Sequence, residues 1–174
     1  MRGPKCSFRL ASAEDWPSIW PIFREVVRAG ETYVFSPEMG EEEARSLWML
    51  EGRDRQRTYV AEVDGKVVGT AQLEPNWPGL GDHVANAGWM ISSQAAGRGI
   101  GRRFAEYVLE EARMLGFEAM QFNAVVETNE RAVHLWKSLG FEVVGRVPGA
   151  FRHATAGRVA FLIMHRDLKR AQST

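Results

Sequence analysis

The sequence predicts a mixed α/β fold whose sheet combines antiparallel and parallel strands. Strand-like and helix-like segments follow the order β-α-α-β-β-β-α-β-α-β-β along the 174 residues. Asp64-Gly65 separates two apolar runs, as in a two-residue antiparallel hairpin. A glycine-rich stretch at 97–101 leads from an apolar run into an amphipathic helix. With the strand that follows, this segment predicts a parallel, right-handed crossover.

The first third of the chain supplies one short strand and two helices. Residues 7–10 form the strand. Ser12 or Asp15 can cap a helix whose apolar side chains keep a 3.6-residue period as far as Gly30. Pro21 removes one helical N–H, so we expect a kink or a late start there. A second helix is expected over 41–51, with its acidic residues in the first turn.

The rest of the chain is rich in strands, expected at 57–63, 66–73, 83–92, 117–126, 142–147 and 158–168. Two amphipathic helices separate the later strands. One runs from the glycine-rich stretch to Gly116, and the other spans about 129–139. Residues 169–174 are expected to form a flexible tail. Residues 1–174 are predicted to form a single domain.

The composition excludes several classes of partner. Apolar residues make up 45% and charged residues 25%, and 22 basic residues balance 22 acidic ones. No overall field therefore favours nucleic acid or an anionic membrane. The single cysteine cannot form an internal disulfide, and no apolar run approaches the length of a membrane span. We expect a cytoplasmic protein with no nucleic acid or membrane partner.

The glycine-rich stretch favours a ligand that carries a pyrophosphate. Helix N-termini offer unpaired N–H groups, and glycines let an anion approach the backbone. The stretch lacks the lysine of a Walker A loop and the third glycine of a dinucleotide-binding loop. Residues 96–101 fit the Q/R-x-x-G-x-G/A loop of acetyl-CoA-binding enzymes at both glycine positions, with Ala96 in place of Gln or Arg. A tight turn without a ligand stays the alternative.

A second motif follows Gly101 by 28 positions: NERAVHLWKSLGFEVVG, residues 129–145, matches the pattern N-x-x-A-x-x-L-Y-x-x-x-G-F except for Trp in place of Tyr. With AGRGIGRRF and the element order, this motif makes the chain resemble the GCN5-related N-acetyltransferase (GNAT) family over almost its whole length. The segment from FNAVVE to VPGAFRH is nearest to phosphinothricin and proline-analogue acetyltransferases.

The resemblance implies a fold and a reaction. The fold is a mostly antiparallel, twisted sheet flanked by helices, whose two central parallel strands splay apart. The co-substrate is acetyl-CoA. The expected reaction is direct attack on its thioester by the amine of a small molecule, an amino acid or an analogue. Acetylation of a protein N-terminus or lysine, and a non-catalytic acyl-CoA-binding module, are the alternatives.

The resemblance also implies which residues bind the donor. Trp89, Met90 and Ile91 face the pantetheine and the acetyl carbonyl, and their backbone N–H groups, that of Ile91 included, stabilise the oxyanion. The pyrophosphate lies on the backbone of Gly97, Arg98, Gly99, Ile100, Gly101 and Arg102. Asn129 touches the pantetheine, caps its helix, or does both.

Two departures from the family leave the proton transfers open. Trp136 stands where many members carry the tyrosine acid, and Asn86 where many carry a glutamate. Another group must therefore accept the proton of the amine. Besides water, the candidates are Glu127, which has the best position in the family geometry, and Glu74, Asp82 and His83.

The acceptor pocket is expected between two loops. Glu31, Tyr33, Phe35 and Trp77 form its walls, Asn123 points into it, and Arg152 and His153 are candidates to close one side. No histidine shows the spacing of a metal site, so no metal is expected. A homodimer through the late strands is expected from the resemblance alone.

Overall fold

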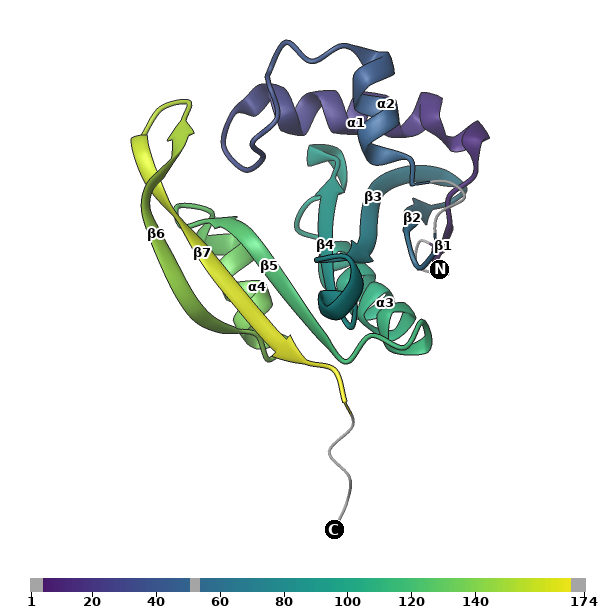
Figure 1. Cartoon of the computed structure of the whole chain (residues 1–174). Helices are drawn as coiled ribbons and strands as arrows, with labels where there is room; N and C mark the ends of the chain where they lie inside the picture. The colour runs from purple at the N-terminus through teal and green to yellow at the C-terminus, as the bar shows by residue number, and fades with distance from the viewer. Residues whose placement is uncertain (1–4, 51–53, 170–174) are drawn as a thin grey trace.

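The computed structural model describes residues 5–50 and 54–169. These residues form a seven-stranded sheet with the order β1-β2-β3-β4-β5-β7-β6 (Figure 1). The strands are β1 Cys6–Leu10, β2 Arg57–Val63, β3 Lys66–Pro75, β4 Val84–Ile91, β5 Ala119–Val126, β6 Glu142–His153 and β7 Gly157–Asp167. The helices are α1 Trp16–Ala29, α2 Glu41–Trp48, α3 Ile100–Met114 and α4 Glu130–Ser138, with 3-10 turns at Ala13–Asp15, Gly79–Gly81 and Ser93–Ala95. The predicted fold class is confirmed.

The β2–β3 hairpin has the predicted two-residue turn. Asp64 and Gly65 have φ values of 49° and 78°, as a type I′ turn requires. The late start expected at Pro21 is wrong, because α1 begins at Trp16 and continues through that residue. An exposed proline in the second turn removes one hydrogen bond and leaves the buried face of the helix intact.

The ends of α2 and β6 differ most from the prediction, and most other element ends agree within two residues. α2 ends at Trp48, because the Trp48 carbonyl accepts hydrogen bonds from the side chains of Thr58 and Gln72; residue 51 lies outside the described residues. β6 continues to His153, beyond the predicted end at 147. Lys169 is held by an ion pair with Glu118 at 2.7 Å, and the rest of the predicted tail lies outside the described residues.

The two parallel strands at the centre of the sheet separate after a short contact. β4 pairs with β5 only at Val84–Ala119 and Ala85–Met120. On its other edge β5 pairs with β7 from Ala119 to Val126, with an irregular register between Phe122 and Val125. Figure 1 shows β4 and β5 diverging. The predicted splay is confirmed.

Each face of the sheet carries its own apolar core. One contains the buried faces of α3 and α4, with Phe104, Val108 and Trp136. The other contains α1 and α2, with Phe23 and Trp48. Among the described residues, no helix combines the length and apolar character needed to cross a bilayer.

A buried hydrogen-bond relay joins α2 to the sheet. Trp48 Nε1 donates to Thr70 Oγ1 at 2.8 Å, and Thr70 Oγ1 donates to the Tyr59 carbonyl at 3.1 Å. All three residues are buried. One hydroxyl therefore satisfies two buried polar groups.

Thr70→Val should lower the free energy of unfolding by about 2 kcal/mol, because the relay loses its hydroxyl while the side-chain volume is kept. Thr70→Ser keeps the hydroxyl and should lose only about 0.8 kcal/mol, for one methyl group. Urea denaturation measures both. A serine variant less stable than the valine variant would contradict the assigned role of the relay.

Candidate active site

A groove with a volume of about 1010 Å³ opens where β4 and β5 separate. Its walls come from both strands, the start of α3, the inner face of α4 and the loop after α1. The groove therefore follows from the sheet topology, which leaves a gap between two strands that begin as neighbours.

Along β4, the backbone N–H and C=O groups of every second residue point toward this groove. Val84 O and Ser92 N bond on the β3 side, to Asn76 N and Val68 O. Even-numbered residues of β4 therefore use their N–H and C=O groups in the antiparallel ladder with β3. The N–H groups of Ala87, Trp89 and Ile91 must then point to the opposite side, where β5 has moved away.

The glycine-rich loop forms an open cradle at the end of the groove. Gly99 caps α3 with φ +72°, and Gly97 has φ +79°. A Cβ added at Gly97, Gly99 or Gly101 would meet no heavy atom within 4 Å. The first bond of the helix runs from Arg103 N to Gly99 O, so the amides of residues 100–102 have no acceptor within α3. This arrangement suits a phosphate-bearing ligand.

Most residues predicted for the donor side line the groove, namely Trp89, Met90, Ile91, Gly97, Gly99, Ile100, Gly101, Arg102 and Asn129. Arg98 does not. The Met90 side chain is buried in the α1 core, and its N–H belongs to the ladder with β3, so the expected contact of that amide with the oxyanion is not supported. Arg102 is already engaged by Ser138 at 2.8 Å and by Glu106 at 3.0 Å.

The comparisons with known proteins identify the family. A family model described as the acetyltransferase (GNAT) family matches residues 16–141. The chain belongs to the GNAT acetyltransferase family. The predicted enzyme class, an N-acetyltransferase, is confirmed.

Solved structures agree with this assignment. A GCN5-related N-acetyltransferase from Kribbella flavida is 51% identical, with a TM-score of 0.90 over 93% of this chain and 97% of that one. A phosphinothricin acetyltransferase from Sinorhizobium meliloti, determined in complex with acetyl-CoA, is 23% identical with a TM-score of 0.84, over 97% of this chain and 91% of that one. The second likeness shows the fold alone.

Curated relatives match only in part. N-acetyltransferase aca1 from Schizosaccharomyces pombe is 35% identical over 94 residues, which are 53% of this chain and 45% of that protein. Protein SPT10 from Saccharomyces cerevisiae is 29% identical over 83 residues, 48% of this chain and 13% of that protein. The chain thus spans less than half the length of these relatives.

Four of the residues expected around the acceptor line the groove, namely Glu31, Tyr33, Phe35 and Asn123. Trp77 does not, and its side chain is 62% exposed. The sequence offered no signal to separate this loop tryptophan from a pocket wall.

Tyr33 lines the groove and is hydrogen-bonded to the backbone of β4. Its hydroxyl donates to the Trp89 carbonyl at 3.0 Å. Burial raises the pKa of this hydroxyl, so it remains a donor at neutral pH. A Cβ at Gly88 would lie 2.9 Å from the same oxygen, so a side chain at residue 88 would displace the Tyr33 hydroxyl from its present position.

The four candidate bases differ in their position and in their partners. Only Glu74 among them lines the groove. Asp82 pairs with Arg55 at 2.6 Å, and His83 is exposed elsewhere. The Glu127 carboxylate accepts two hydrogen bonds from Arg146, at 2.7 and 2.8 Å. These bonds lower the pKa of Glu127, so its position and its pairing both argue against the expected role as base.

Other lining residues escaped the sequence analysis. Glu25 of α1 lines the groove and accepts a hydrogen bond from Ser93 N at 3.1 Å. Val26 and Ala29 line it beside Glu25. The sequence offered no signal that separates these residues from the other residues of the same helix. Trp136, which the sequence analysis placed at the position of the family's tyrosine, lines the groove with its ring 4.8 Å from the rings of both Trp89 and Phe122.

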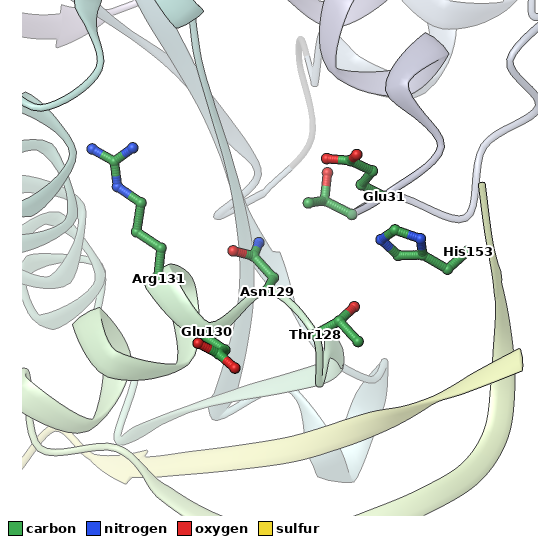
Figure 2. A pocket seen from close by; sticks show the side chains of 7 residues that line it. Glu31, Thr128, Asn129, Glu130, Arg131 and His153 are labelled. Carbon is green, nitrogen blue, oxygen red and sulfur yellow. The ribbon is translucent and has the colours of Figure 1, made fainter. Parts of the chain in front are cut away.

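A smaller pocket of about 350 Å³ adjoins the groove and is shown in Figure 2. Its lining residues are Glu31, Thr32, Thr128, Asn129, Glu130, Arg131 and His153. Within the described ranges 5–50 and 54–169, no group of three or more His, Cys, Asp or Glu side chains is arranged to hold a metal ion.

Glu127→Gln should leave the rate of acetyl transfer within about twofold between about pH 6 and pH 8, because the carboxylate lies outside the groove and remains ionised in its pair with Arg146. Steady-state kinetics measure this. A loss of more than about 100-fold, the range of general base removal, would restore Glu127 as the base.

Proposed function

We propose that this chain transfers the acetyl group of acetyl-CoA to the amine of a small, amino-acid-like molecule. The observation that carries the proposal is the splay of β4 and β5, which leaves the N–H groups of Ala87, Trp89 and Ile91 without strand partners beside a glycine cradle. Family membership supports acetyl transfer, and the acceptor class is the new part of the proposal.

The residues present fit the donor. The open glycines at 97, 99 and 101 allow a pyrophosphate to reach the helix amides without steric conflict. The β4 amides on the groove side can pair with the pantetheine as a partner strand would. Trp89 N–H and Ile91 N–H are the groups we assign to the thioester oxygen, where negative charge develops during attack.

Glu74 is the carboxylate we assign to proton removal. It lies directly across from Asn86 in the β3–β4 ladder, so the two side chains share one face of the sheet. It lines the groove and accepts a hydrogen bond from Gln56 Nε2 at 3.4 Å. As the acceptor nitrogen bonds to the thioester carbon, its proton passes to Glu74 through water and the carbon–sulfur bond breaks. A thiolate with a pKa near 8.5 leaves without an acid at Trp136.

The enclosure of the acceptor side favours small molecules. The turn between β6 and β7 reaches the end of α1, where Ala154 N donates to Gly30 O at 2.9 Å. This contact lies next to the pocket that contains Glu31 and His153. A groove for a protein segment would need this side open.

The homodimer and the cytoplasmic location stay predictions. β6 is an edge strand of the sheet, and Val143, Val144 and Val147 are exposed along it. We propose that this edge pairs with a second copy, as unpaired strand edges readily do.

Gly101→Val should weaken acetyl-CoA binding at least about tenfold, because the added side chain projects into the cradle that the pyrophosphate needs. The free energy of unfolding should change by no more than about 0.5 kcal/mol, since the helix propensities of valine and glycine are similar. Titration calorimetry and thermal unfolding separate the two effects. Gly101→Ala, a smaller change, is the control, and unchanged binding by the valine variant would contradict the cradle.

Glu74→Gln should lower kcat by about 100-fold with the acetyl-CoA dissociation constant unchanged, because the variant loses the base and keeps the donor site. Stopped assays of thiol release measure kcat, and Glu127→Gln is the matched carboxylate control. If the Glu74→Gln enzyme keeps full kcat, Glu74 is not the base and another group accepts the proton of the amine.

A further inference from the structure

The smaller pocket is continuous with the groove at four residues, because Glu31, Thr32, Asn129 and Arg131 line both. The smaller pocket is therefore open to an acceptor that lies in the groove. Figure 2 shows the His153 ring directed into the pocket near Glu31, with Asn129 on the other side of the pocket and Arg131 extending away from all three.

His153 is held by the turn that follows it. Its Nδ1 accepts hydrogen bonds from Thr155 N at 3.2 Å and from Ala156 N at 3.1 Å. An Nδ1 that accepts from two N–H groups carries no hydrogen, so the neutral ring carries it on Nε2. The ring points into the pocket (Figure 2), and Nε2–H is thus a donor with a fixed direction.

The turn itself is anchored to the opposite wall. Ala154 N donates to Gly30 O at 2.9 Å. A Cβ at Gly30 would lie 3.2 Å from Ala154 Cβ, and Gly30 has φ +64°. His153 and Glu31 therefore lie beside the two ends of one backbone contact, which fixes the separation of their backbones.

The pocket offers both hydrogen-bond donors and a carboxylate. Asn129 Oδ1 accepts a hydrogen bond from Ala132 N at 3.2 Å and so caps α4. The two hydrogens on Asn129 Nδ2 are not used in this cap and can be donated to another acceptor. His153 Nε2–H and the Asn129 amide complement an oxygen atom, whereas Glu31 complements a cationic nitrogen. An amino acid presents both groups within a few atoms.

We propose that His153 is a specificity-determining residue that donates a hydrogen bond from Nε2–H to a carboxylate oxygen of the acceptor. Glu31, at the junction of the two cavities, attracts the ammonium group of the same molecule. This inference rests on the proposed acetyl transfer to an amino-acid-like amine. It predicts that amines without a carboxylate are poorer acceptors.

Two substitutions separate recognition by His153 from its structural role. In His153→Asn, the amide oxygen can replace Nδ1 as acceptor for the turn, as asparagine does in Asx turns, but no donor remains at the position of Nε2. In His153→Gln, a donor reaches that position and the acceptor for the turn is lost.

The experiment compares amino acids with the amines that lack their carboxylates. For an amino acid that the wild-type enzyme acetylates, His153→Asn should raise the KM at least about tenfold, the effect of one lost hydrogen bond to a charged group. The KM for the matching amine, the KM for acetyl-CoA and the kcat should change less than about threefold. His153→Gln should keep the preference for the amino acid.

Other outcomes would overturn the inference. If the wild-type enzyme is active and His153→Asn leaves the KM for amino acids unchanged, His153 has no recognition role and the proposed function stands. If wild-type enzyme binds acetyl-CoA but acetylates no amine, the proposed function falls as well. Long-range ¹H–¹⁵N spectra test the geometry without turnover, and a hydrogen on Nδ1 of neutral His153 would contradict the inference.

Discussion

The fold depends on one constraint, the need of the β4 backbone for hydrogen-bond partners after β5 has left it. β4 and β5 pair at only two positions, and beyond them one side of β4 has no strand beside it. Unpaired backbone groups in an apolar interior are costly unless something supplies their partners. The Tyr33 hydroxyl donates a hydrogen bond to the Trp89 carbonyl. The remaining groups are available to an extended ligand, and the groove exists because the sheet is incomplete.

The elements around the groove supply what the incomplete sheet lacks. α3 begins at the open end of β4 and brings its unpaired amides there. α4 covers the gap on one face, with Trp136 packed against Trp89. On the other face, α1 and its loop carry the carboxylates of Glu25 and Glu31 to the rim. The lining of the groove therefore combines the carboxylates of Glu25 and Glu31 with the aromatic rings of Trp89 and Trp136.

Much of this arrangement was predictable from local chemistry. The glycines at 97, 99 and 101 predicted the cradle because few other uses require so little side chain beside a helix start. The expected base at Glu127 depended on contacts that local sequence does not encode. Arg146, which captures that carboxylate, belongs to β6. Similarly, the parity of β4 that turns Met90 N–H toward β3 is a property of strand register.

The contact between Ala154 and Gly30 links residues 124 positions apart in the numbered chain. The strand that flanks β5 on its far side, β7, follows that contact in the chain. During synthesis, the glycine cradle and β4 emerge from the ribosome long before the hairpin that fixes the far wall. A nascent chain that ends before residue 154 therefore has the glycine-rich loop but lacks the contact beside the smaller pocket, so the two cavities are complete only after the final strands have been made.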